Sequence, residues 1–227
     1  MQEFNFIDVL AQSCANYRTT GAYISETQAT EAAYTGKTIY SSKQLLLYHF
    51  YPNLVPEDFE TIVVTNDDIS HATTIIKYFR RLTFRAISNN ISDFHSIILS
   101  YIDVEKVTGK AFAMIACMPM AYKRDYDINT KSKVIMQTEG KVLEPIGDQI
   151  QTYCYILDVK YVTSVKFSDF YAYTAITTDG FLIEFTNKKK VAENGQSLQI
   201  KGKIRDHSVD YNTKKPLTRI NYVKILN

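Results

Sequence analysis

The sequence lacks most of the residue patterns that mark a disulfide-rich, metal-binding or membrane-spanning protein. It contains no tryptophan, and its three cysteines, Cys14, Cys117 and Cys154, are far apart, with no CxxC pair. No histidine stands near them at zinc-ligand spacing, so a disulfide framework or a structural zinc is not expected. The first three of the four scattered histidines are expected to be exposed or to make single hydrogen bonds.

Long apolar runs are also missing. No stretch approaches the ~18 apolar residues that cross a bilayer. Met1 to Tyr17 lacks the basic start and long apolar core of a secretion signal. With 45% apolar and 22% charged residues, the composition is that of an ordinary globular protein. We therefore expect a soluble intracellular protein, and 227 residues favour two small domains.

Motifs of three common enzyme classes are absent. The chain has no GxxxxGK(S/T), GxSxG or HExxH, which open the sites of phosphate-loop enzymes, hydrolases and zincins. Two carboxylate pairs, Asp67 with Asp68 and Asp125 with Asp127, resemble nuclease metal ligands. We assign the first pair to a helix start and the second to a solvated linker. The sequence therefore predicts a non-catalytic protein without cofactor or metal.

Charge is divided unevenly along the chain. From Gly140 to Asn227 there are 11 Lys and 2 Arg against 9 Asp and Glu, a net charge of +4. From Met1 to Glu139 the net charge is −2. A polyanionic partner is therefore expected to bind the C-terminal part.

Apolar spacing predicts a mainly helical domain over residues 1–124. Helices are expected over 4–14, around 45–49, after Thr65 and from Ser92 to about Glu105. The third has the strongest signal, because Thr65 is a good N-cap, Asp68 follows three residues later, and an apolar stripe runs from Ile69 to Leu82. Residues 112–118 fit a buried helix or a strand, 21–37 a loop or mobile arm, and 125–139 a polar linker.

After Gly140 the pattern changes to that of strands. β-rich runs cover 150–165, 170–177, 181–186, 198–205 and 217–226, and Asp179-Gly180 and Asn194-Gly195 mark turns between them. Five short strands in about 80 residues suit a Greek-key barrel better than a sandwich. The predicted fold class is α+β, with a helical N-terminal domain followed by a five-stranded OB-like barrel over 140–227.

The fourth predicted strand has one basic face. Lys201, Lys203, Arg205 and His207 project from one side with a repeat of ~7 Å, close to the phosphate spacing of a nucleic-acid strand. The alternative is a solvated edge strand, where lysine deters aggregation. Further cations flank this strand: Lys188, Lys189, Lys190, Lys214, Lys215 and Arg219.

Aromatic residues alternate in the second and third predicted strands. Tyr171 and Tyr173 share one face, and Phe181 and Phe185 share a face of the next strand. We expect the phenylalanines in the core and the tyrosines on the surface, because a phenol tolerates water. Exposed tyrosines beside lysines are typical of sequence-tolerant single-strand binding.

The C-terminal region resembles a family of OB-fold single-stranded DNA-binding modules of bacteriophage proteins. The resemblance rests on Gly147-Asp148, Ile150, Thr178-Asp179-Gly180, Phe185-Thr186, Gly195, Ile200 to Ile204, His207, Tyr211, Thr218, Val223 and Lys224. It covers about 80 residues and implies a ligand lying across strands two and three, between the loops that join strands one to two and four to five. The zinc-binding cysteine cluster and acidic tail of many such proteins are missing.

The combined prediction is a non-catalytic single-stranded DNA-binding protein that acts in phage replication, recombination or transcription, in the cytoplasm of an infected bacterium. DNA is favoured over RNA, with no membrane partner. The predicted nucleic-acid-binding residues are Tyr171, Tyr173, Lys188, Lys189, Lys201, Lys203, Arg205, His207, Tyr211, Lys214, Lys215 and Arg219. Two alternatives remain: an accessory subunit that docks on a polymerase or transcription complex through its helical domain, and a virion or host-interaction protein.

Overall fold

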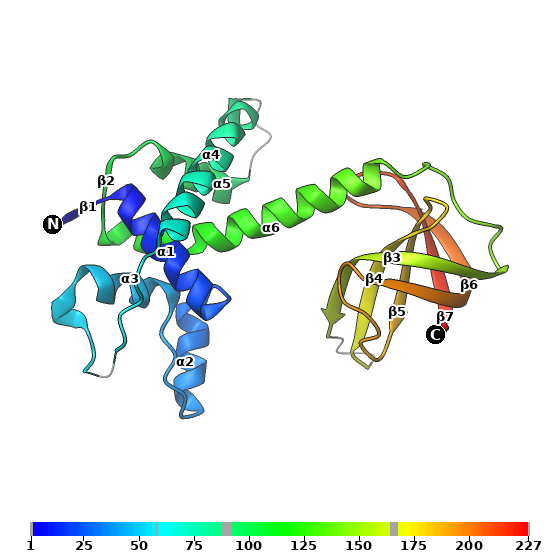
Figure 1. The fold of residues 1–227 in the computed structure, drawn as a ribbon, viewed down its shortest axis with the longest axis horizontal. Coiled ribbons are helices and arrows are strands. Elements are labelled where there is room, and N and C mark those ends of the chain that lie inside the picture. Colours follow the sequence, from blue (N-terminus) through cyan, green and yellow to red (C-terminus); the bar gives the residue numbers. More distant parts are fainter. Residues whose placement is uncertain (1, 58, 88–91, 164–167, 227) are drawn as a thin grey trace. The chain divides into compact units, whose positions relative to one another are not determined.

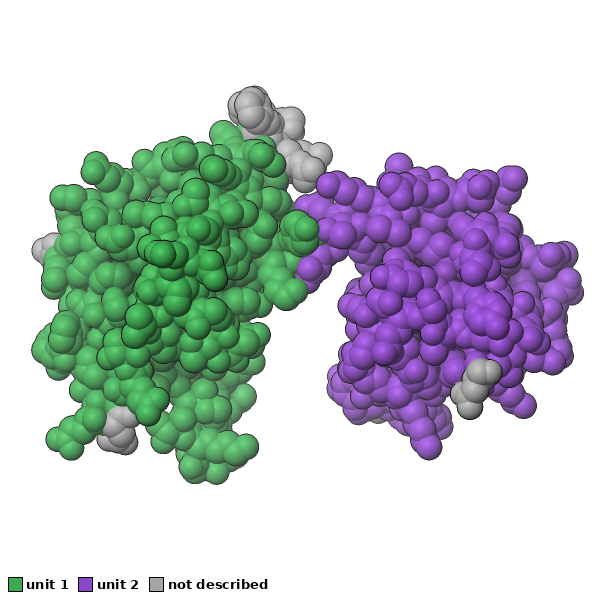
Figure 2. All heavy atoms as spheres, viewed as in Figure 1, with its two compact units in different colours: residues 1–126 green, residues 127–227 purple. Residues whose placement is uncertain are grey.

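The structure is a computed structural model that describes residues 2–57, 59–87, 92–163 and 168–226 (Figure 1). The chain divides into two compact units, Met1–Tyr126 and Asp127–Asn227 (Figure 2). The first is mainly helical and the second is a closed β-barrel. The predicted α+β class is confirmed. Among the described helices, none combines the length and the apolar character needed to span a bilayer.

The first unit is built from helices and one small sheet. Its elements are β1 (Glu3–Asn5), α1 (Phe6–Thr20), α2 (Glu26–Tyr34), α3 (Ser42–Phe50), η1 (Pro52–Leu54), α4 (Asn66–Ile87), α5 (Asp93–Ile102), β2 (Lys106–Thr108), η2 (Gly109–Ala111) and the start of α6 (Phe112–Met136). The predicted helices correspond to α1, α3, α4 and α5. Strands β1 and β2 pair antiparallel, with Phe4 opposite Val107.

Helix α4 begins where the sequence predicts. Thr65 Oγ1 accepts the Asp68 N–H at 3.3 Å, and the Asp68 carboxylate accepts the Thr65 N–H at 2.9 Å. This reciprocal pair satisfies two amides that the first turn leaves free. The helix packs against α1 and α5 and buries Ala72, Ile75 and Phe79 of its apolar stripe, whereas Ile69 at its start is exposed. The core of the unit includes Val9, Leu10, Cys14, Ala72, Ile75, Phe79, Ile98, Phe112 and Ile115.

Two expectations for the first 140 residues need correction, and one open alternative is decided. Residues 26–34, within the expected loop, form α2, because Ser25 and Gln28 make a complete capping box. Residues 112–118, for which helix and strand were both open, are helical. The expected linker 125–139 is not irregular, since α6 continues through it to Met136 and the unit boundary lies inside this helix.

The second unit contains five strands in the order of an OB-like barrel. They are β3 (Gln149–Val162), β4 (Phe170–Thr177), β5 (Leu182–Asn187), β6 (Ser197–Val209) and β7 (Pro216–Leu226). The barrel closes in the order β3-β4-β5-β7-β6; β5 and β7 are parallel, and the other pairs are antiparallel. Gly180, at the predicted hairpin between β4 and β5, has φ +80°, a conformation that favours glycine.

The last turns of α6 pack against the outside of this barrel. Ile135 is almost completely buried against Leu182 and Leu217. Lys131 Nζ lies 2.7 Å from the Asp158 carboxylate on β3. This end of the helix therefore belongs to the barrel unit, and it covers the outer face of β5 near the β4–β5 hairpin.

Candidate nucleic-acid interface

The alternation predicted for the fourth strand of the barrel is present in β6. Ile200, Gly202 and Ile204 are buried, and Lys201 and Lys203 are exposed between them. A pleated strand sends successive side chains to opposite faces. The buried side of β6 therefore lines the barrel, and its lysines point outward.

The neighbouring strands extend this outer face. Lys201 is opposite Gln151 of β3 on one side and Lys224 of β7 on the other. Lys203 is likewise opposite Gln149 and Asn221. We call this surface the basic face; its members are Lys201, Lys203, Lys224, Gln149, Gln151, Gln199 and Asn221. Tyr153, exposed on β3, adjoins it opposite Gln199.

The basic face carries positive charge that the fold does not neutralise. Among the described residues, none of its three lysines forms an ion pair, and all three are exposed. Lys201 and Lys224 stand directly opposite each other on adjacent strands, where like charges destabilise a sheet. The long amide side chains beside them add hydrogen-bond donors and acceptors. The surface suits an extended polyanion.

Several predicted binding residues are occupied by internal contacts. Arg219 Nε donates to Glu184 at 2.9 Å, a bond that raises the pKa of the guanidinium, and its Nη1 lies 3.6 Å from Asp206. Arg205 also pairs with Asp206. Arg219 therefore links β7 to Glu184 of β5 and Asp206 of β6, and Arg205 pairs with its neighbour in the same strand.

Lys215 and His207 are likewise engaged. Lys215 Nζ donates to the Thr138 carbonyl at 3.0 Å, which fastens the segment after α6 to the barrel. The His207 ring lies 3.2 Å from the Thr218 hydroxyl. Each of these side chains therefore has a hydrogen-bond partner within the barrel unit.

The remaining predicted cations lie in loops at opposite ends of the barrel. Lys188 and Lys189 follow the end of β5, whereas Lys214 precedes the start of β7. Because β5 and β7 run parallel, these positions are separated by the length of the strands. Lys214 Nζ lies 4.7 Å from the centroid of the Tyr211 ring, and both side chains are exposed. This pair forms a second, smaller cationic site.

The prediction that Tyr173 is an exposed stacking platform is wrong. Its side chain is completely buried and stacks on Phe185, which is in the core as predicted. The Tyr173 hydroxyl accepts the Val191 N–H at 2.8 Å, so the phenol is satisfied without water. Tyr171, on the same inward face, is only partly exposed, and its ring centroid lies 5.0 Å from that of Tyr161.

The tyrosines that the barrel does expose are different ones. They are Tyr153, Tyr155, Tyr161, Tyr211 and Tyr222. The outer face of β4 and β5, where the resemblance implied the ligand, presents Thr174, Glu184 and Thr186. Since Glu184 already binds Arg219 there, the combination of free cations and aromatic rings is found around β6 and β7 instead.

A cavity of about 340 Å³ opens at the end of the barrel near β3 and β4. It is lined by Val159, Tyr161, Tyr171, Lys190, Glu193 and Asn194. Lys190 is held by Glu193 in an ion pair, so its charge is compensated inside the cavity. The lining therefore combines two tyrosine rings with an ion pair.

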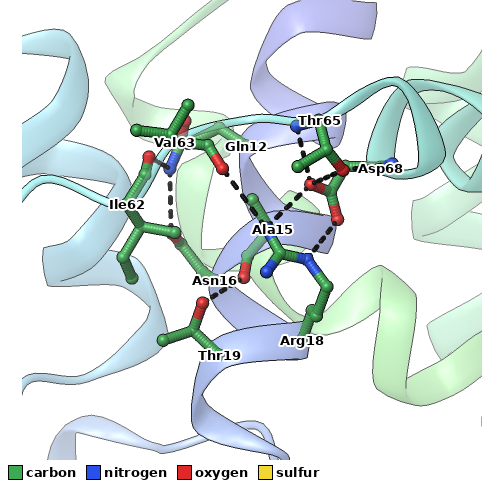
Figure 3. A network of polar contacts seen from close by, with 9 residues as sticks. All are labelled: Gln12, Ala15, Asn16, Arg18, Thr19, Ile62, Val63, Thr65 and Asp68. Atoms are coloured by element: carbon green, nitrogen blue, oxygen red, sulfur yellow. Dashed lines mark hydrogen bonds and ion pairs between the residues drawn. The ribbon is translucent and has the colours of Figure 1, made fainter.

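The main polar network of the first unit joins α1 to the start of α4 (Figure 3). Arg18 binds both oxygens of Asp68, with Nε–Oδ1 at 3.1 Å and Nη2–Oδ2 at 3.0 Å. Burial alone would raise the pKa of Asp68, but the bonds from Arg18 and Thr65 outweigh it and lower that pKa. Asp68 serves a helix start, as predicted. Gln12 Nε2 donates to the Ile62 carbonyl and fixes the segment before α4.

A second polar cluster joins α5 to α6. His95 Nε2 lies 2.6 Å from Asp125 Oδ2, and His95 Nδ1 lies 2.6 Å from Ser92 Oγ. His95 therefore has two side-chain partners rather than one, and Asp125 is mostly buried rather than solvated. Since Ser92 Oγ also accepts the His95 N–H as the N-cap of α5, the cluster anchors helices. In the described part of the chain, no group of three or more His, Cys, Asp or Glu is placed to hold a metal ion.

No family model, curated protein or solved structure matches this chain.

Proposed function

We propose that this protein binds single-stranded nucleic acid, DNA in preference to RNA, without catalysis, and that the basic face of the barrel is the main contact surface. The resemblance of the barrel sequence to phage single-strand binding modules supports a role in phage replication, recombination or transcription. The observation that carries the proposal is the uncompensated row of Lys201, Lys203 and Lys224.

The arrangement favours a single strand for two physical reasons. Phosphates bind exposed lysines through charge and release counterions. Exposed tyrosines such as Tyr153 offer ring faces on which unpaired bases stack, and every base has such a face. In a duplex the bases are stacked on each other, so only the sugar-phosphate backbone is available to the same surface.

The test is a titration of labelled single-stranded and duplex oligonucleotides against salt. Three phosphate contacts on a single strand predict a slope of log affinity against log salt of about −2, at about −0.7 per contact. Replacing Lys201 and Lys224 together with Gln is expected to flatten this slope by about 1.4. The loss of affinity is expected to be equal for all sequences, because phosphate contacts carry no base information.

The matched control replaces two exposed lysines of the first unit, Lys77 and Lys110, with Gln. It removes the same charge, and we expect it to leave the slope unchanged. Equal effects of both double variants would show diffuse attraction and would remove the basic face from the proposal. If the protein binds an oligonucleotide only when a replication or transcription protein is added, the accessory-subunit alternative replaces direct binding.

A further inference from the structure

Strand β7 contains a bulge beside the basic face. Lys201 pairs with Lys224, and two residues further along β6, Lys203 pairs with Asn221. Gly202 therefore stands opposite two residues of β7, Tyr222 and Val223. This two-against-one count defines a β-bulge, a feature that re-aims side chains and occurs often beside functional sites.

The bulge holds Tyr222 in an unusual backbone conformation. Its φ is +56°, and among the described residues only Lys214 is another non-glycine with positive φ. In bulges of this type the left-handed position is normally glycine. A tyrosine there is strained, and such strain persists where the surroundings enforce it, most often at ligand sites.

The opposite strand is shaped to accept the bulge. A Cβ added to Gly202 would lie 2.5 Å from Ile220 Cγ2 and 3.0 Å from the Asn221 carbonyl oxygen. Only glycine leaves room for the two strands to approach at this point. Gly202 is therefore a positioning residue for the bulge.

The Tyr222 ring adds little packing to the barrel. Its side chain is 82% exposed, whereas Val223 beside it packs into the core. Along β7 it follows Asn221 of the basic face and lies two residues before Lys224, and Asn221 pairs with Lys203 across the ladder. An exposed aromatic ring thus stands at a constrained backbone position near uncompensated cations.

We infer that Tyr222 is a base-stacking platform that receives an unpaired nucleobase while the neighbouring lysines hold its phosphates. This inference rests on the proposed function and adds the position of one base. It places that base beside strands β6 and β7, away from the outer face of β4 and β5. The bulge holds the backbone of Tyr222 in place before binding, so only the side-chain torsions of the ring are ordered on binding.

The test compares Tyr222→Ala, Tyr222→Phe and the unchanged full chain by fluorescence anisotropy. Two probes are used: a thymidine oligonucleotide and an oligomer of the same length with abasic sugar phosphates. Tyr222→Ala is expected to weaken binding of the thymidine strand about 5- to 150-fold, the range for one stacked base. Tyr222→Phe is expected to retain affinity, because it keeps the ring. Tyr34→Ala, which removes an equally exposed tyrosine from the first unit, is the control and is expected to have no effect.

The abasic probe separates stacking from other causes. With no base to stack, the unchanged chain and Tyr222→Ala should bind it equally and with the same salt slope. An equal loss of affinity for both probes would mean that the ring contacts the sugar-phosphate backbone of the probe or supports the protein fold. Either result overturns the inference. Unchanged affinity of Tyr222→Ala for thymidine would also overturn it, while a salt slope that still depends on Lys201 and Lys224 would leave the proposed function standing. If the unchanged chain binds neither probe, both proposals fail.

Discussion

Tyr173 and Phe185 stack face to face inside the barrel, with ring centroids 4.9 Å apart and ring planes 8° from parallel. Each residue lies on the inward side of its strand, and the two are directly opposite in the β4–β5 ladder. This pair determines which face of β4 is buried. It also removes Tyr173 from the set of residues able to meet a ligand.

We predict that Tyr173→Ala lowers the free energy of unfolding of the barrel by about 3–5 kcal/mol, as for other buried aromatic rings. Tyr173→Phe should cost only about 1 kcal/mol, because it keeps the ring and loses the hydrogen bond from the Val191 amide. Urea unfolding followed by circular dichroism measures both. Tyr153→Ala, at an exposed position, is the control and should stay within about 0.5 kcal/mol. Similar values for Tyr173→Ala and Tyr153→Ala would show that Tyr173 is not in the core.

The end of α6 predicts where a stable barrel fragment begins. We expect residues 127–227 to unfold cooperatively, and residues 140–227 to be less stable by about 3 kcal/mol or more, since they lack the buried Ile135. They also lack the Lys131 partner of Asp158. Denaturant unfolding of both fragments is the measurement, with Ile135→Ala in the full chain as an independent check. Equal stability of the two fragments would mean that α6 contributes nothing to the barrel.

Local signals allowed much of the fold to be predicted from the sequence. The Thr65 and Asp68 cap, the Asp179-Gly180 turn and the alternation along β6 each depend on residues within a few positions of one another. These interactions form within one element, so their pattern is visible in the chain. The OB-like order follows from five short strands with these turns.

Features that depend on register were not predicted. Alternation gives β4 two faces, and both Tyr173 and Ala172 fit a core. The stacking of Tyr173 on Phe185 of the next strand decides between them, and the Val191 N–H, 18 residues away, satisfies the buried hydroxyl. Arg219 was expected to be free because its partner Glu184 lies 35 residues earlier, on a parallel strand. Lys224 was missed as a member of the basic face because the bulge sets its position beside Lys201.

Asp68 predicts acid sensitivity of the first unit. Its folded pKa is lowered, so its contribution is complete above the unfolded value of about 3.9 and is lost as pH falls through the folded pKa. We expect Asp68→Asn to lower the free energy of unfolding by about 1.5–3 kcal/mol near pH 7, the range for hydrogen bonds to a charged group. Unfolding from pH 7 to 2 should show this difference narrowing below about pH 4. A difference that stays constant over the range would contradict the lowered pKa.

The three buried cysteines predict protection from thiol reagents in the native state. Burial raises the pKa of Cys14 to about 12 and those of Cys117 and Cys154 to about 11, so little thiolate is present at pH 8. We expect iodoacetamide to label them only when the chain opens. Mass spectrometry of labelled peptides over a urea series would follow Cys14 and Cys117 for the first unit and Cys154 for the barrel. Labelling of any of the three in water as fast as a free thiol would contradict its burial.

Tyr222 predicts opposite effects on stability and on binding. Relief of the left-handed strain, about 1–2 kcal/mol, exceeds the backbone entropy cost of glycine, about 0.5–1 kcal/mol. Tyr222→Gly should therefore raise the free energy of unfolding by about 0.5–1 kcal/mol. The loss of an exposed ring removes little packing. Tyr222→Ala keeps the strained backbone, so we expect its stability to stay within about 0.5 kcal/mol of the unchanged chain.

The same two variants should lose affinity for single strands to a similar extent, because both lack the ring. If Tyr222→Gly makes the protein more stable and weakens its binding, then Tyr222 is retained for binding at a cost to the stability of the fold. Urea unfolding and anisotropy on the same preparations give both quantities. If Tyr222→Gly instead destabilised the barrel, the tyrosine would be contributing to the fold, and the strained bulge would no longer support a ligand site.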